Sequence, residues 1–142
     1  MIINIRHTGI VVRNMQLSLK FYSTLGFRVY KETDEPIDFI SEISGKKLTS
    51  LKTIKLSAPQ GNMIELLEYG SLETVLEKYP NLCRVGPAHI AFTVKNLDAV
   101  YQKLIQEGIN FISMPQCSPD GQAYLVFCQA PEGTFIELVE EL

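Results

Sequence analysis

The chain has 142 residues, of which 46% are hydrophobic and 20% charged, and its formal net charge is −3. This length allows one compact domain or two small modules with a shared core, and the composition argues against disorder. The slight acidity argues against nucleic-acid binding, which normally needs a basic surface, and no apolar run is long enough to cross a membrane. Three scattered cysteines and an N-terminus without a signal-peptide core indicate a cytoplasmic protein.

The first half of the chain predicts a strand, a helix and three further strands. β-Branched residues predict the first strand over residues 2–12, and Asn14 is the expected N-cap of the helix. Apolar residues then recur at every fourth position: Leu17, Phe21 and Leu25. This spacing predicts an amphipathic helix with one buried stripe, which ends at Gly26. The remaining strands are expected over residues 27–31, 51–57 and 62–69.

The first half also contains an insertion. Gly26 and Ala58 are 32 positions apart, whereas the matching Gly108 and Ala130 are 22 apart, so ten extra residues are present. Isoleucines within it fall at helical spacing: Ile37, Ile40 and Ile43. With Gly45 as a stop, they predict a short helix, which is either a wall of a binding site or a surface decoration.

The second half repeats the order of the first. After a linking helix over 71–79 and a loop over 80–87, a strand is expected over 88–94 and a helix N-cap at Asn96. The helical stripe contains Leu97, Val100, Tyr101, Leu104 and Ile105. Gly108 ends this helix. Further strands are expected over 109–113, 123–129 and 134–140, so each half is predicted as βαβββ.

The repeat is visible in the residues themselves. His7 and His89, the only two histidines, each precede a matching glycine by 19 positions, since 26 − 7 = 19 and 108 − 89 = 19. Each half closes on the pattern Ala-Pro-x-Gly-x-x-Ile-Glu-Leu, with its glutamate at Glu65 or Glu137. We expect one domain over residues 1–142, with a first module at 1–69, a linker at 70–86 and a second module at 87–142.

The two histidines and two glutamates form a candidate metal site. In each closing strand the isoleucine and leucine beside the glutamate should pack on the helix, which sends Glu65 and Glu137 to the opposite face. A divalent cation would offset the cost of burying two carboxylates. Two imidazole nitrogens and two carboxylate oxygens suit nickel, cobalt, zinc, manganese or ferrous iron. The pattern therefore predicts one divalent ion held by His7, Glu65, His89 and Glu137; the alternative is that both pairs are structural.

Several motifs occur in one order along the chain: His7-x-Gly9-Ile10-Val11-Val12, Leu25-Gly26-Phe27, Gly86-Pro87-Ala88-His89 and the two closing patterns. In this order and doubled, they resemble the vicinal oxygen chelate superfamily, which includes glyoxalase I, methylmalonyl-CoA epimerase, extradiol dioxygenases, and fosfomycin and bleomycin resistance proteins. The resemblance implies an α+β fold in which two tandem βαβββ modules form a curved mixed sheet around a metal-binding cleft. It also implies a homodimer.

In glyoxalase I the ligands are His, Glu, His and Glu, in the strands matched here by His7, Glu65, His89 and Glu137. The resemblance therefore implies a glyoxalase I-type isomerase or lyase, in which a small substrate binds the ion through adjacent oxygens. The ion would stabilise an enediolate, and Glu137 or Glu65 would serve as the base.

Two alternatives remain open at this stage. One is an epimerase of the methylmalonyl-CoA type, whose members usually have Gln where this chain has Glu65. The other is a non-catalytic protein that binds a small molecule such as an antibiotic. Val11 stands where bacterial glyoxalase I typically has an Arg that helps to bind glutathione, and Tyr69 where it tends to have Asn. Both departures weaken the expectation that glutathione is part of the substrate.

Overall fold

The structure is a computed structural model in which residues 1–70, 82–83 and 85–142 are described. The chain divides into two compact units, unit 1 (Met1–Val75) and unit 2 (Leu76–Leu142), and each is described by itself. The linking helix predicted over 71–79 lies outside the described residues.

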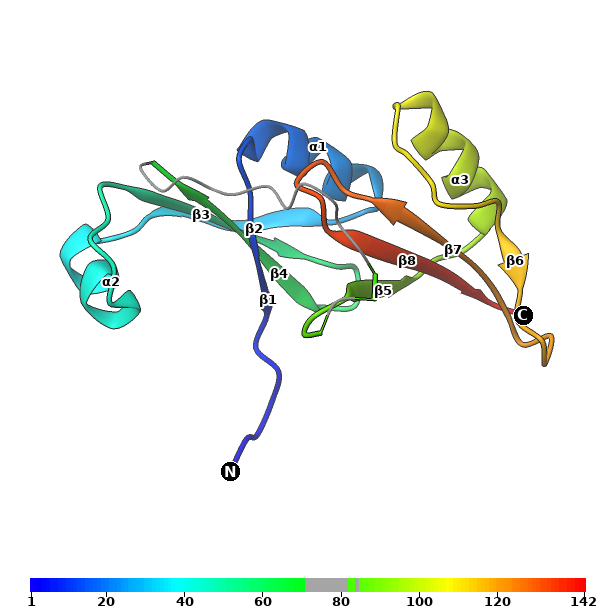
Figure 1. Ribbon diagram of the computed structural model, residues 1–142, viewed down its shortest axis with the longest axis horizontal. Coiled ribbons are helices and arrows are strands. Elements are labelled where there is room, and N and C mark those ends of the chain that lie inside the picture. Colours follow the sequence, from blue (N-terminus) through cyan, green and yellow to red (C-terminus); the bar gives the residue numbers. More distant parts are fainter. Residues whose placement is uncertain (71–81, 84) are drawn as a thin grey trace. The chain divides into compact units, whose positions relative to one another are not determined.

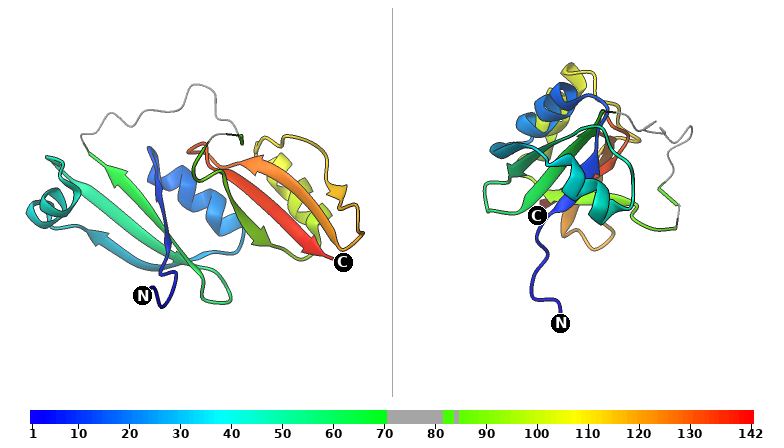
Figure 2. Two further views of the ribbon diagram at one scale, coloured as in Figure 1. Left: turned by 60° about the horizontal axis from the view of Figure 1, so that its bottom comes forward. Right: turned by 90° about the vertical axis from the view of Figure 1, so that its left-hand side faces the viewer.

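Unit 1 is a four-stranded mixed sheet with two helices (Figure 1). Its elements are β1 (Thr8–Val11), α1 (Met15–Thr24), β2 (Arg28–Asp34), α2 (Ile37–Ser44), β3 (Leu51–Ser57) and β4 (Met63–Tyr69). The strand order is β1-β4-β3-β2, with β1 parallel to β4 and the other neighbours antiparallel. Helix α1 packs on one face of this sheet through contacts with β4 (Figure 2).

Unit 2 has the same topology. Its elements are β5 (His89–Thr93), α3 (Leu97–Gln106), β6 (Gln116–Cys117), β7 (Ala123–Gln129) and β8 (Phe135–Glu141). The strand order is β5-β8-β7-β6, with β5 parallel to β8, so each strand has a counterpart in unit 1. The predicted α+β architecture of two tandem βαβββ modules is confirmed.

The helices begin and end at the capping residues that the sequence predicted. Asn14 and Asn96 each accept a hydrogen bond of 3.1 Å, through Oδ1, from the backbone N–H three residues further on. Gly26 and Gly108 follow α1 and α3 with φ of +95° and +80°, which glycine adopts without strain. The inserted helix is also confirmed, since α2 ends at Gly45 with φ of +64°.

Two predicted strands were wrong in extent. The strand expected over residues 2–12 is β1, which begins only at Thr8, because Thr8 pairs with Ile64 and β4 itself begins at Met63. Among the described strands, none pairs with the residues before His7. The strand expected over 109–113 is reduced to one isolated bridge, and the edge strand is β6 instead. Pro115, which has no N–H to donate, lies between the two.

The predicted buried stripe of α1 was right at Phe21 and wrong at Leu17. Leu17 is 54% exposed, and the buried residues of α1 are Met15, Ser18, Phe21 and Tyr22. The N–H of Met15 donates to Glu68 Oε1 on β4 at 2.9 Å, so the sheet fixes the first turn of the helix. Tyr22 is fully buried, whereas Leu17 lies on the exposed side of the helix.

Three residues after Glu65 and Glu137, a further glutamate in each closing strand, Glu68 or Glu140, accepts hydrogen bonds from the start of a helix. Glu140 accepts hydrogen bonds of 2.8 Å from the backbone N–H groups of Asn96 and Leu97, as Glu68 does from Met15. A carboxylate at this position satisfies free N–H groups and complements the positive end of the helix dipole. The repeat of these glutamates thus has a structural cause.

We predict that Glu140→Gln lowers the free energy of unfolding by about 1–2 kcal/mol, because a charged acceptor for two helix N–H groups is lost. Urea unfolding followed by circular dichroism would measure the change. Glu141→Gln is the matched control, since Glu141 is exposed at the end of the same strand. Equal stability of the two variants would contradict this role for Glu140.

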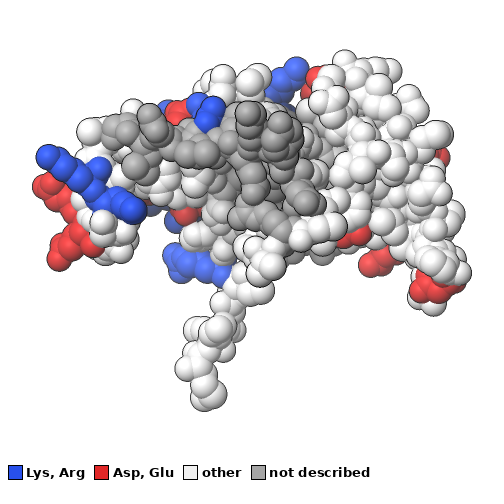
Figure 3. All heavy atoms as spheres, viewed as in Figure 1, with Lys and Arg blue, Asp and Glu red and all other residues white. Residues whose placement is uncertain are grey.

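The described helices include none with the length and apolarity needed to cross a membrane. Basic and acidic side chains are interspersed at the end of unit 1 that carries α2, whereas uncharged residues dominate the visible face of unit 2 (Figure 3). The charges at the α2 end therefore partly offset one another.

Candidate metal centre

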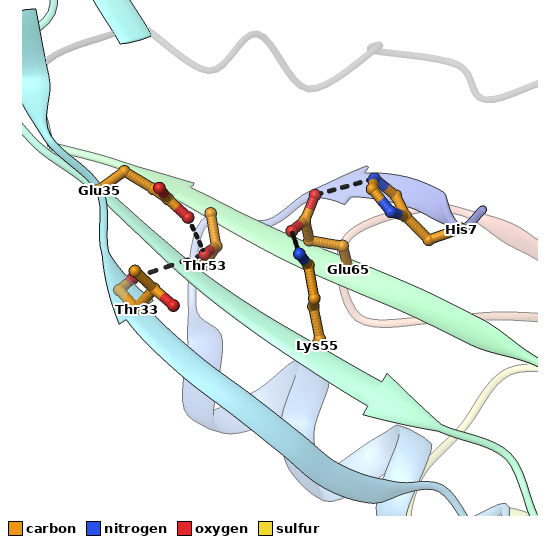
Figure 4. A network of polar contacts seen from close by, with 6 residues as sticks. All are labelled: His7, Thr33, Glu35, Thr53, Lys55 and Glu65. Atoms are coloured by element: carbon orange, nitrogen blue, oxygen red, sulfur yellow. Dashed lines mark hydrogen bonds and ion pairs between the residues drawn. The ribbon is translucent and has the colours of Figure 1, made fainter. Parts of the chain in front are cut away.

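Unit 1 brings its histidine and its glutamate together. His7 directly precedes β1, and Glu65 lies in the middle of the neighbouring strand β4. Their side chains point toward one another, with His7 Nε2 at 3.0 Å from Glu65 Oε2 (Figure 4). Ile64 and Leu66 are buried on the other face of the strand, as predicted, so Glu65 emerges on the face away from α1.

Unit 2 builds an equivalent pair. His89 begins β5 and Glu137 lies in β8, with His89 Nε2 at 3.3 Å from Glu137 Oε2. In the two parallel strand pairs, Ala91 stands opposite Glu137 as Gly9 stands opposite Glu65, so the two glutamates occupy matching register positions.

The four predicted site residues are therefore found as two His–Glu pairs, one in each unit. Taken alone, neither unit gathers three or more His, Cys, Asp or Glu side chains as a possible metal cluster among its described residues.

The donor chemistry of each pair fits a divalent ion. Metal–ligand distances to imidazole nitrogen and carboxylate oxygen are about 2.0–2.2 Å, so two such donors at right angles around one ion are about 3 Å apart. The observed separations of 3.0 and 3.3 Å match this spacing. Both glutamate side chains are largely shielded, at 12% and 20% exposure, which raises the cost of leaving a carboxylate without a cationic partner.

A lysine that the sequence analysis did not single out contacts the glutamate of the unit 1 pair. Lys55 of β3 is the cross-strand partner of Glu65, and its Nζ lies 3.4 Å from Glu65 Oε1 (Figure 4). In unit 2 the residue opposite Glu137 is Phe127, whose ring meets the His89 ring edge-on with centroids 5.3 Å apart. Each partner precedes its glutamate by ten residues, since 65 − 55 and 137 − 127 are both 10. The length of each hairpin therefore indicates which residue of the preceding strand lies opposite the glutamate.

A second polar contact joins the residue just before α2 to the face of the sheet that carries Lys55 and Glu65. The Thr53 hydroxyl, which is buried, donates to Glu35 Oε1 at 2.7 Å; the Thr33 carbonyl is farther, at 3.5 Å (Figure 4). Glu35 lies just before α2 and its N–H donates to the Leu51 carbonyl at 2.9 Å. The segment leading into α2 is thereby fixed to β3, two residues from Lys55.

The cysteines do not contribute to the candidate site. Cys128 is fully buried in unit 2, and burial raises the pKa of its thiol to about 12, so it stays protonated and unreactive near neutral pH. Cys83 and Cys117 are exposed.

Comparison with known proteins decides the family. The sequence matches the family model of the Glyoxalase/Bleomycin resistance protein/Dioxygenase superfamily over residues 4–138. The chain belongs to this superfamily. The match includes both His–Glu pairs and confirms the resemblance seen in the sequence motifs, whereas a search among curated proteins finds no match.

Solved structures of the superfamily share the fold at low sequence identity. A glyoxalase family protein from Bacillus cereus is 19% identical with a TM-score of 0.90, over 100% of this chain and 96% of that chain. The fosfomycin resistance protein FosX from Listeria monocytogenes, in complex with Mn(II) and sulfate, is 15% identical with a TM-score of 0.66, over 100% and 95%. An E144Q mutant of glyoxalase I from Zea mays is 17% identical with a TM-score of 0.71, over 96% of this chain and 47% of that chain.

Proposed function

We propose that the protein is a metal-dependent isomerase or lyase of the glyoxalase I type, active as a homodimer in the cytoplasm. One observation carries the proposal: each unit holds a histidine nitrogen within 3.0 or 3.3 Å of a glutamate oxygen, on matching strands. His7, Glu65, His89 and Glu137 would together hold one nickel, cobalt, zinc, manganese or ferrous ion. The Mn(II) complex of FosX supports a divalent ion as the cofactor of this fold.

A bound divalent ion supplies Lewis-acid stabilisation of negative charge on adjacent substrate oxygens. Glu137 then takes the proton from the carbon next to the substrate carbonyl, because it is the less restrained carboxylate. Its Oε2 faces His89, and no hydrogen bond or ion pair from a described residue reaches its Oε1. Glu65 has contacts at both oxygens, from His7 and Lys55, and serves to hold the ion.

The residues around Glu65 argue against a glutathione adduct as the preferred substrate. Glu65, Leu67 and Tyr69 alternate along β4, and Val11 stands opposite Leu67, so Val11 and Tyr69 share the face of Glu65. Neither side chain offers the cation or the amide found at these positions in bacterial glyoxalase I. We therefore favour a different small molecule with adjacent oxygens.

Elemental analysis of the purified protein tests the proposal. We expect about one divalent ion per chain, and we expect His89→Ala to hold far less because it removes one of four ligands. Glu141→Gln is a matched control and should retain the ion, since Glu141 is exposed at the end of β8. A folded wild-type protein without a stoichiometric ion would contradict the proposal and favour a non-catalytic small-molecule-binding protein.

A substrate screen on the metal-loaded protein distinguishes a glyoxalase from a methylmalonyl-CoA-type epimerase. Turnover of the hemithioacetal of methylglyoxal and glutathione would indicate a glyoxalase. Deuterium incorporation from D₂O at the α-carbon of methylmalonyl-CoA would indicate an epimerase.

A further inference from the structure

The two units differ at the residue that faces the glutamate. The cross-strand partner of Glu65 is Lys55, whereas that of Glu137 is Phe127. Cross-strand partners share one face of a sheet with their Cβ atoms about 5 Å apart. One carboxylate therefore has an ammonium group beside it, and the other has an aromatic ring that also contacts His89.

More positive charge lies beside Lys55. Lys31 of β2 is the cross-strand partner of Lys55, and Arg28 stands opposite Ser57, two residues along on the same face. Like charges directly opposite one another destabilise a sheet, so the Lys31–Lys55 pair carries a local cost. Glu35 also reaches this face and keeps its negative charge while it accepts a hydrogen bond from a threonine hydroxyl. Three cations (Arg28, Lys31 and Lys55) still outnumber the two carboxylates of this face, Glu35 and Glu65, so the β2–β3 side of the pair carries surplus positive charge.

Lys55 is available to a second partner. Its Nζ lies 3.4 Å from Glu65 Oε1, longer than the roughly 2.7–2.9 Å of a strong ammonium–carboxylate hydrogen bond. An ammonium group has three donors, and the Lys55 side chain is 27% exposed. Two carboxylates and two neutral imidazoles balance a divalent cation in formal charge, so loading the site leaves Lys55 without a compensating negative charge.

Resting on the proposed metal-dependent function, we propose that Lys55 binds an oxyanion group of the substrate, next to the oxygens that chelate the ion, and that Lys31 reinforces this charge. The substrate is accordingly an acid and not a neutral carbonyl compound. The subsite belongs to unit 1 alone, because Phe127 occupies the equivalent position in unit 2.

The test uses Mn²⁺-loaded full-length protein and two small probes, lactate and lactamide. Both probes can chelate the ion through the hydroxyl and one oxygen of the acid or amide group. Only lactate then has a second carboxylate oxygen, which shares the negative charge, left for Lys55. Paramagnetic broadening of the probe's methyl proton signal gives its dissociation constant, and electron paramagnetic resonance of free Mn²⁺ gives the metal occupancy. The variants are Lys55→Met, Lys55→Arg and the control Lys52→Met, which removes a lysine paired with Glu32 on the other face of β3.

We expect Lys55→Met to weaken lactate binding about tenfold or more, as loss of a charged hydrogen bond implies, and to leave lactamide binding unchanged. Lys55→Arg and Lys52→Met should bind lactate like the wild type. Equal lactate binding by wild type and Lys55→Met, equal losses for both probes, or no lactate binding by the Mn²⁺-loaded wild type would overturn the oxyanion subsite. Failure of the wild type to bind Mn²⁺ would instead overturn the metal-dependent function, and this subsite with it.

Discussion

Replacing Glu137 by glutamine is expected to slow proton abstraction by a factor of about 10²–10⁴, the usual contribution of a positioned general base. Glutamine keeps the size of the side chain and one carbonyl oxygen, but it cannot accept the substrate proton. The fold should survive, because Glu137 is on the face of β8 away from the core residues Ile136 and Leu138. The measurement is the rate of exchange of the substrate C–H proton with D₂O, for whichever substrate the screen identifies.

Two controls make this result specific. Metal content, measured on the same preparations, separates loss of the base from loss of the ion. Glu141→Gln makes the same charge change four residues further along β8, at an exposed position, and should exchange at the wild-type rate. Full exchange by metal-loaded Glu137→Gln would show that another group removes the proton.

The element types were predictable because their signals are local. Asparagines at the helix starts, glycines after the helix ends and alternating burial in the closing strands each act within a few residues. The errors arose where a partner strand decides the outcome. Residues before His7 have strand-forming side chains but pair with no strand in the part of the chain that the structure describes, and residues 109–113 form one isolated bridge to β7 there.

The candidate site was likewise predictable only in part. His7, Glu65, His89 and Glu137 could be picked out because the sequence repeat marks equivalent positions, and the strand period assigns their face. Lys55 escaped notice because the repeat breaks there: its counterpart is Phe127. A search for repeated residues finds what the two units share, whereas the register of each hairpin is needed to find what distinguishes them.

The packing of α1 gives the second large effect. We expect Leu66→Ala to lower the free energy of unfolding by about 2–5 kcal/mol, because Leu66 is fully buried in β4 on the face that packs against α1. Leu17→Ala should change it by less than about 0.5 kcal/mol, because Leu17 is 54% exposed. Both variants remove the same atoms from a leucine, so burial supplies most of the difference between them; a smaller part comes from alanine, which suits the helix at Leu17 better than the strand at Leu66. Urea unfolding of both, followed by circular dichroism, provides the comparison.

The fourfold spacing of Leu17, Phe21 and Leu25 makes the opposite prediction, since a helix packed along that stripe would bury Leu17. A large loss of stability in Leu17→Ala would therefore indicate that Leu17 is buried, as the spacing predicts, and contradict its exposed position in the structure. The structure keeps Phe21 of that stripe buried and buries Met15 and Tyr22 with it. The N–H of Met15 also donates to the Glu68 carboxylate at the start of α1, and this contact with the sheet cannot be read from the spacing of apolar residues.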